Sequence, residues 1–354
     1  MTRGATSRLH QPGCVVLATY KPSKELLIRQ LRSIQQQSVS SYTCLITADG
    51  DPASTQLIVD EAVGGDDRFI VIGHTDRVGF FSNFERGLQA VPTRARWVAL
   101  SDQDDYWYPS KLESLVPHLD TYSLVSGQAR VVEHPSGAVI TESTQRRNST
   151  TECLVLDNQF TGAQLVFRRE LLDVALPFPH LNTATEVHDH WLAFVARGLS
   201  GTLITDDVLQ DYVQHGANVI GEARRGFSLR GALRTALGLT RRYEGNVSVG
   251  AIRRAVYKAG VGWPETMVEH RALRLVGATD DGLLARSFGS DRSAWRTAKR
   301  VLTLAKRHDI SLRAAATYLA GSVAGSVGSL RRGLSERIAE NVSALPERTS
   351  PSSI

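Results

Sequence analysis

Two patterns of apolar positions alternate along the first third of the chain. Short apolar runs occupy residues 15–18, 43–48, 69–72 and 97–100. Between these runs, apolar side chains recur three and four positions apart, as they do at Leu27, Leu31 and Ile34. The runs predict buried strands, and the longer spacing predicts amphipathic helices. Strands that alternate with helices predict an α/β fold, in which a mostly parallel sheet carries helices on both faces.

Local signals predict where some of these elements begin and turn. Ser82 with Glu85, and Ser110 with Glu113, have the S-x-x-E spacing of a capping box, in which each side chain bonds the backbone N–H of the other residue. Residues 123–140 read as two strands broken by His134, Pro135, Ser136 and Gly137, which predicts a hairpin.

Beyond residue 222 the chain becomes Arg-rich and helical in character. Residues 294–307 predict a helix with one apolar face, formed by Trp295, Ala298, Val301, Leu302 and Ala305. Basic side chains occupy much of the rest of this helix. This pattern is typical of a helix on an anionic bilayer, and also of an ordinary surface helix. Residues 314–330 are shorter and less apolar than the about 20 residues that a spanning helix requires.

The net charge of +5 conceals a contrast between two parts of the chain. Residues 222–354 hold 23 Lys and Arg against 11 Asp and Glu, a net charge of +12, whereas residues 1–221 have a net charge of −7. The basic part suits an anionic surface. We therefore predict four regions: a disordered N-terminus (1–12), an α/β domain (13–221), a basic helical region (222–345) and a disordered tail (346–354).

Composition restricts the class of protein further. The polar start, MTRGATSRLHQPG, lacks the apolar segment of a signal peptide. Cys14, Cys44 and Cys153 are odd in number and lack metal-ligand spacing, so we expect no disulfide framework. Both observations favour the cytoplasm, with peripheral contact to the inner face of the cell membrane through the basic region.

An acidic stretch, SDQDDYWYP, follows the last of the four apolar runs. Asp102, Asp104 and Asp105 repel one another unless water or a cation neutralises them, and clustered carboxylates suit hard divalent cations such as Mg²⁺ or Mn²⁺. An exposed acidic turn is the alternative. Tyr20 and Asp49 also follow predicted strands, and in parallel sheets ligands bind beyond the carboxyl ends of the strands. We therefore expect these residues at one edge of the sheet.

Taken in order, the motifs resemble family 2 of the nucleotide-sugar glycosyltransferases. The resemblance rests on LATYKP, an Asp-Gly turn after the second strand, DRVGFFSNFERGL, SDQDDYWYPSKLE, TGAQLVF, HDHWLAF and YVQHGANVIG, and it covers roughly residues 13–221. Within this family the chain is most similar to bacterial rhamnosyltransferase-like members. Their typical motifs are DQDD followed by an aromatic residue, and HDxW followed later by a QHxxN segment. The resemblance implies a GT-A (Rossmann-like) fold, Mg²⁺ or Mn²⁺, a nucleoside-diphosphate sugar donor and inverting transfer to a glycan or lipid-linked acceptor in surface polysaccharide synthesis.

The resemblance also implies roles for individual residues. The donor-binding positions are Thr19, Tyr20, Asp49, Arg77 and Asp102. The metal positions are Asp104, with Asp102 and His215 as further contacts. Asp189 matches the general base, and His188 and Trp191 match the acceptor side. The sequence departs from the family pattern at Ala48, where members often have Asp, and at Asp76 and Arg77, where an Asn is frequent. These departures bear on the nucleotide base and hence on the donor.

Each assignment has a structural alternative. Tyr20 can be the aromatic end of a strand, Asp189 can be a helix N-cap or a partner of the helix dipole, His215 can be a structural histidine, and Trp191 can belong to the core. Two other classes of function also fit parts of the chain. A sugar nucleotidyltransferase shares the sheet and the acidic cluster but usually has a Gly-rich phosphate loop, which KPSKEL lacks. A non-enzymatic protein would use the basic region to bind a membrane or nucleic acid.

Nucleic acid is not expected as a partner of that region. Sequence-tolerant binding of single strands uses aromatic side chains on which successive bases stack. Tyr243, Trp263 and Trp295 are too widely spaced along the basic region to do this. A membrane surface is therefore the better use of the positive charge.

Overall fold

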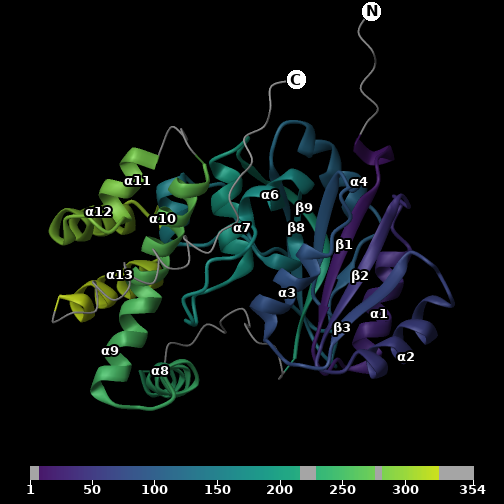
Figure 1. Cartoon of the computed structure of the whole chain (residues 1–354), viewed down its shortest axis with the longest axis horizontal. Helices are drawn as coiled ribbons and strands as arrows, with labels where there is room; N and C mark the ends of the chain where they lie inside the picture. Colours follow the sequence, from purple (N-terminus) through teal and green to yellow (C-terminus); the bar gives the residue numbers. More distant parts are fainter. Residues whose placement is uncertain (1–7, 216–228, 276–280, 327–354) are drawn as a thin grey trace, which may run out of the picture. The chain divides into compact units, whose positions relative to one another are not determined.

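The computed structural model describes residues 8–215, 229–275 and 281–326 (Figure 1). The chain divides into two compact units. The first comprises Met1–Thr150, Asn158–Leu176 and Val187–Gly226, and the second comprises Thr151–Asp157, Pro177–Glu186 and Phe227–Ile354. The second unit thus includes two short segments from within the predicted α/β domain. The predicted boundary at residues 221 and 222 and the predicted tail at 346–354 lie outside the described residues.

The first unit is built on a nine-stranded sheet with the order β3-β2-β1-β4-β8-β6-β9-β5, in which β7 pairs with β6. Strands β3, β2, β1 and β4 are parallel, and β8 continues the sheet antiparallel to β4. The strands are β1 (Gly13–Thr19), β2 (Tyr42–Asp49), β3 (Phe69–His74), β4 (Trp97–Ser101), β5 (Tyr106–Trp107), β6 (Leu124–Glu133), β7 (Val139–Thr141), β8 (Leu165–Arg168) and β9 (Thr202–Gln214).

Helices cover both faces of the parallel strands, which confirms the predicted α/β class. Val15 and Leu17 of β1 belong to a buried cluster with apolar side chains of α1 (Lys24–Gln35), α2 (Pro52–Val63) and α4 (Lys111–Leu115). The opposite face meets α3 (Phe80–Gln89), where a Cβ on Gly87 would lie 2.6 Å from Val16 Cγ1. Burial on both faces explains why these strands are continuous apolar runs in the sequence. The predicted hairpin is also present, because β6 and β7 pair antiparallel.

The helix starts differ from the predicted capping boxes. Helix α3 begins at Phe80 with Gly79 at its N-cap, so Ser82 lies inside the helix. Ser110 is the N-cap of α4, but its side chain makes no capping hydrogen bond, and Glu113 instead accepts a bond from the Ser38 hydroxyl at 2.9 Å. The predicted capping boxes were therefore wrong at both helix starts. At α4, Glu113 bonds to Ser38 and not to the helix start.

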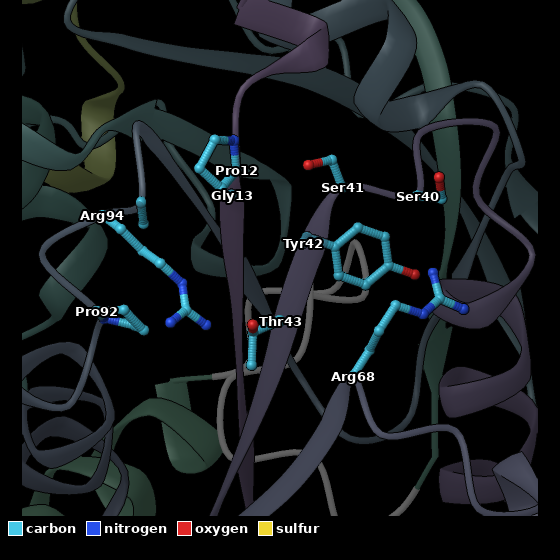
Figure 2. A pocket seen from close by; sticks show the side chains of 10 residues that line it. Pro12, Gly13, Ser40, Ser41, Tyr42, Thr43, Arg68, Pro92 and Arg94 are labelled. Carbon is cyan, nitrogen blue, oxygen red and sulfur yellow. The ribbon is translucent and has the colours of Figure 1, made fainter.

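The amino ends of β1 and β2 border a hollow of about 240 Å³ (Figure 2). Arg94 and Arg68 line it, together with Ser40, Ser41 and Tyr42. A second hollow of about 430 Å³ lies beside α1. No residue that the sequence assigned to donor, metal, base or acceptor lines either hollow.

Helices dominate the second unit, which confirms the predicted basic helical region. These helices are α5 (Thr151–Leu156), α8 (Leu229–Glu244), α9 (Val249–Tyr257), α10 (Trp263–Arg274), α11 (Asp281–Phe288), α12 (Ala294–Lys306) and α13 (Leu312–Gly325). Inside this unit Arg292 and Glu265 form a buried ion pair at 2.5 Å. Within the predicted apolar face of α12, Val301 and Ala305 are buried, and Trp295 and Leu302 are exposed.

The ends and the cysteines complete the description. Arg8–His10 form a 3-10 helix, and Arg8 pairs with Asp120 at 3.0 Å, so the predicted disorder of residues 1–12 does not extend to these residues; residues 1–7 lie outside the described part. The three cysteines are buried and not joined by disulfides, as expected. Among the residues described, no helix combines the length and apolar character that crossing a lipid bilayer requires.

Candidate active site

The predicted donor residues Tyr20 and Arg77 lie together at the carboxyl edge of the parallel strands. Tyr20 directly follows β1, and the guanidinium carbon of Arg77 stands 4.0 Å from the centroid of its ring. A cation over an aromatic face at this distance is attracted to the ring. Thr19, the last residue of β1, is buried, and its hydroxyl donates to the Thr47 carbonyl at 3.5 Å. Thr19 therefore holds β1 against β2 at this edge.

Asp49 fixes the loop that carries Arg77. Its two carboxylate oxygens accept hydrogen bonds from the backbone N–H groups of Val78 and Gly79, at 2.8 and 2.9 Å. Gly79 has φ of 86°, a conformation that glycine adopts without steric cost. Asp49 is buried at the end of β2, so the loop before α3 is tied to the sheet. Asp49 thereby positions Arg77 beside Tyr20.

Gln103, which the sequence reading did not single out, holds the backbone of Tyr20 from both sides. Its side-chain oxygen accepts from the Tyr20 N–H at 2.8 Å, and its nitrogen donates to the Tyr20 carbonyl at 3.3 Å. An amide side chain can donate and accept at once, whereas a carboxylate can only accept. Gln103, the non-acidic residue of DQDD, thus fixes the backbone of Tyr20. The only sequence signal for this role was its position between two aspartates.

The carboxylates of Asp104 and Asp189 both act on Asp102. Burial, together with the negative charges of Asp104 and Asp189, raises the pKa of Asp102 to about 7. The structure therefore brings the predicted metal motif near the predicted base, although about 85 positions separate them. Asp104 Oδ2 also lies 2.7 Å from His215 Nε2, so two of the three predicted metal positions are in direct contact.

The residues at this edge fit a divalent cation that has few protein ligands. In the described part of the chain, no group of three or more His, Cys, Asp or Glu side chains is arranged to hold a metal ion. The donor set is nevertheless suitable, because Asp102 and Asp104 supply oxygens, and the pKa of Asp102 is raised by burial and then by the negative charges of Asp104 and Asp189, which a cation would offset. Mg²⁺ commonly takes one or two carboxylates and completes its shell with water and substrate phosphates.

Asp105, whose role the sequence left open, faces the protein interior. Its carboxylate accepts from the Val213 N–H at 3.1 Å and from the Gln210 side chain at 3.2 Å, both on β9. Gln210 in turn accepts from the buried ammonium of Lys111 at 2.6 Å, which also donates to the Ala163 carbonyl at 2.7 Å. Burial raises the pKa of Asp105 and lowers the pKa of Lys111. This network joins the acidic stretch to β9.

Asp189, the predicted base, lies in the first turn of α7 (His188–Arg197). Its carboxylate accepts from the Asn158 amide at 2.9 Å, the Gly162 N–H at 3.0 Å and the His190 N–H at 2.6 Å. Burial raises its pKa to about 6, against the lowering effect of these bonds. The helix N-cap is Val187, so Asp189 is not the capping residue, but it lies in the first turn, where a carboxylate interacts favourably with the helix dipole.

His188 and Trp191 do not lie where acceptor contacts were expected. Trp191 is fully buried, and its indole N–H donates to the Ala175 carbonyl at 2.9 Å. His188 is also buried, and its ring stacks on Phe84 with a centroid distance of 4.0 Å. Burial lowers the pKa of His188 to about 3, which keeps the ring neutral. Both side chains therefore pack in the core, as the structural alternative for Trp191 proposed, and the acceptor roles stay predictions.

Part of the chain is similar to a known protein family. Residues 14–170 match the family model described as glycosyl transferase family 2. No match is found among the curated proteins. Among solved structures, S. aureus TarS 1-349 in complex with UDP-GlcNAc shows 11% identity and a TM-score of 0.46, and covers 89% of this chain and 91% of its own.

The mannosyltransferase PcManGT from Pyrobaculum calidifontis, in complex with GDP-Man and Mn²⁺, shows 17% identity and a TM-score of 0.47, and covers 95% of this chain and 86% of its own. Likenesses of this size do not by themselves establish a shared activity. The family match does, however, include Tyr20, Asp49, Arg77 and the acidic stretch. Residues 14–170 of this chain are therefore similar to glycosyl transferase family 2.

Proposed function

We propose that this protein transfers a sugar from a nucleoside-diphosphate sugar to a hydroxyl acceptor, with a divalent cation as cofactor and inversion at the anomeric carbon. The observation that carries the proposal is that the charges of Asp104 and Asp189 both act on Asp102, in a chain whose residues 14–170 match the family 2 model. Transfer needs two kinds of carboxylate, one to hold a cation and one to accept a proton. A carboxylate that binds a cation is not free to do both.

Asp189 is the proposed base. Its carboxylate is held by Asn158 and by the Gly162 N–H, so its direction is fixed before the acceptor arrives. A pKa of about 6 leaves most of this group ionised at neutral pH and makes it a stronger base than an ordinary aspartate. Asp189 would take the proton of the acceptor hydroxyl while the oxygen attacks the anomeric carbon and the diphosphate leaves from the opposite side.

Asp104 and Asp102 are the proposed ligands of Mg²⁺ or Mn²⁺, with His215 beside Asp104. When bound, the cation supplies positive charge that stabilises the leaving diphosphate. Gln103, between Asp102 and Asp104, keeps Tyr20 in place. The acidic stretch thus serves the diphosphate side of the donor, and Tyr20 with Arg77 serves its nucleotide side.

The donor and acceptor classes extend the proposal. Arg77 over Tyr20 makes a flat cationic surface that suits a nucleotide base and its phosphates. The rhamnosyltransferase-like motifs support a deoxyhexose or hexose donor. They also support a glycan or lipid-linked acceptor of the kind used in bacterial surface polysaccharide synthesis.

A thermal-shift screen of nucleoside diphosphates and nucleotide sugars, with and without Mn²⁺, tests the proposal. A ligand at a hundred times its Kd stabilises the folded protein by about 2.7 kcal/mol, so at least one nucleoside diphosphate should raise the Tm by a few degrees. The shift should require Mn²⁺ or Mg²⁺ and should be lost in Asp104→Asn. If no nucleoside diphosphate stabilises the protein under any of these conditions, the transferase proposal is wrong.

A further inference from the structure

Helix α12 exposes a large aromatic side chain to solvent. The chain has five tryptophans, of which Trp97, Trp107, Trp191 and Trp263 are buried, whereas Trp295 is 79% exposed. Leu302, seven positions later, is 47% exposed. Seven residues are nearly two helical turns, so these two apolar side chains share one side of the helix. Aromatic and aliphatic side chains of this size are normally covered, in the fold or by a partner.

Contacts within the second unit fix the direction in which Trp295 points. On the inner side of α12, the Thr297 hydroxyl donates to the Ser287 carbonyl at 2.8 Å. Arg300 makes two bonds to the Glu152 carboxylate of α5, at 2.8 and 2.5 Å. Val301 and Leu304 are buried on this side. The helix is therefore held in one rotation about its axis, and the exposure of Trp295 follows from that rotation.

The outward side of α12 is also cationic. Arg296, Lys299 and Lys306 are exposed there, and the helix contains no Asp or Glu. Among the described residues, none forms an ion pair with these three side chains, whereas Arg300 is occupied by Glu152. Lys299 lies one turn from Trp295, and Lys306 lies one turn from Leu302. Apolar and basic side chains are thus interleaved on the same outward surface, which we call the α12 face: Trp295, Arg296, Lys299, Leu302 and Lys306.

The neighbouring helix continues the apolar character. Helix α13 packs against α12 (Figure 1), and it leaves Leu312 and Val323 among the most exposed apolar side chains of the chain. Its exposed positions also include Ala316 and Ala320, and Arg313 is its only charged residue. A partner that fits this pair of helices must therefore accept both apolar surface and positive charge.

We propose that the α12 face binds the surface of an anionic lipid bilayer. At such a surface Trp295 and Leu302 enter the boundary between headgroups and acyl chains, while Lys299, Lys306 and Arg296 remain at the level of the phosphates. Nucleic acid fits less well, because the face offers one aromatic side chain for stacking and places aliphatic side chains beside it. The proposal does not depend on the transferase reaction, because it uses only residues of the second unit.

Intrinsic fluorescence of the full-length protein tests the proposal directly, since Trp295 is the one exposed tryptophan of five. Without vesicles, acrylamide should quench a fraction of the emission, and Trp295→Phe should abolish that fraction. Vesicles of phosphatidylcholine containing phosphatidylglycerol should protect the fraction and shift its emission to shorter wavelength, and vesicles of phosphatidylcholine alone should not. Protection of Trp295 in the absence of vesicles would show that this chain or a second copy covers the face, and would overturn the proposal.

Cosedimentation with the same vesicles measures the contribution of each side chain. A basic residue near an anionic surface contributes about a fivefold increase in binding, so Lys299→Gln/Lys306→Gln should weaken binding about 25-fold. Trp295→Ala should weaken it about tenfold. The matched controls are Arg94→Gln/Arg96→Gln, with the same charge change on exposed residues of the first unit, and Leu57→Ala, which removes another exposed apolar side chain.

The controls should bind within twofold of the unchanged protein, and all the variants should keep its Tm because every altered side chain is exposed. Equal losses in the controls and the α12 variants would overturn the proposal, because binding would then follow net charge alone. Binding that persists on uncharged vesicles, or in 0.5 M salt, would also overturn it. So would displacement of the protein from vesicles by a short single-stranded oligonucleotide at micromolar concentration, since the α12 face would then be a nucleic-acid surface.

Discussion

The imidazole of His215 lies 2.7 Å from the carboxylate of Asp104, although 111 positions separate the two residues. Strand β9 makes this contact possible, because it pairs antiparallel with β5 and ends one residue before His215. The Asp105 carboxylate accepts a hydrogen bond from the Val213 N–H of β9. This bond fixes the register of β9 beside the acidic stretch. Asp105 therefore helps to place His215 beside Asp104.

Asp104→Asn should lower transfer by roughly 10²- to 10³-fold, because the loss of one charge removes the main attraction for the cation beside the diphosphate. His215→Ala should have a smaller effect, about tenfold to 100-fold, and should raise the Mn²⁺ concentration at half-maximal rate. A metal titration of the initial rate measures both. Asp120→Asn, which changes an exposed carboxylate paired with Arg8, is the control and should keep full activity. Activity that survives complete chelation would remove the metal assignment.

Asp189→Asn should reduce kcat by roughly 10²- to 10⁴-fold and leave the Kd of the donor nearly unchanged, because a base acts on the acceptor hydroxyl and not on the nucleotide. Isothermal titration with a nucleoside diphosphate, together with initial rates, separates the two quantities. Asn158→Ala is the matched variant, because it removes one hydrogen bond to the carboxylate and keeps its charge. A loss of donor affinity in Asp189→Asn, with kcat preserved, would show that Asp189 serves binding instead.

The rate should depend on pH through Asp189. The pKa of this group is raised from 3.8 to about 6, and a base must be unprotonated to act, so kcat/KM should be constant near pH 7.5 and fall tenfold per unit well below pH 6. An aspartate with its ordinary pKa would keep full activity down to about pH 5. A pH profile at saturating Mn²⁺, restricted to conditions in which the Tm is unchanged, checks the midpoint. A rate that is flat between pH 5 and 7 would contradict the assignment.

Asp105→Ala should destabilise the fold by about 2–3 kcal/mol, because the Val213 N–H and the Gln210 amide lose their buried acceptor. Asp105→Asn keeps one acceptor oxygen and should cost less. Lys111→Met should be destabilising too, and the double variant should depart from additivity by about 1–2 kcal/mol because Gln210 links the two residues. Urea unfolding measures each value. Additive effects would mean that the network does not couple Asp105 to Lys111.

A variant at Gly162 gives an independent check on the environment of His188. A Cβ at this position would lie 2.3 Å from His188 Nε2, and the ring is confined on its other side by Phe84. Gly162→Ala should therefore destabilise the protein by about 1–3 kcal/mol. It should also displace the backbone N–H of residue 162, which donates a hydrogen bond to the Asp189 carboxylate. Gly238→Ala, at an exposed position without positive φ where a Cβ would have no neighbour within 4 Å, is the comparison without a packing cost. Equal stability of the two variants would contradict the packing.

The sequence by itself determined the α/β class and the edge at which the site lies. Apolar runs such as residues 43–48 have to be buried on both faces, and parallel strands end at a common edge, so Tyr20, Asp49 and Asp102 were bound to meet there. The order of the motifs added the family 2 resemblance, which the match over residues 14–170 confirms. These features follow from neighbours along the chain and from the period of two or 3.6 residues.

Only the tertiary structure decided how individual side chains are used. Gln103, Lys111 and Gln210 carry no local signal, because their partners are distant in sequence. Trp191 was assigned to the acceptor side and lies in the core, and only the structure shows that Trp295, on the predicted apolar face, is exposed. A helical pattern shows which residues share a side of the helix, but not the rotation at which neighbouring elements hold it. That rotation is set by long-range contacts, such as the bonds from Arg300 to Glu152.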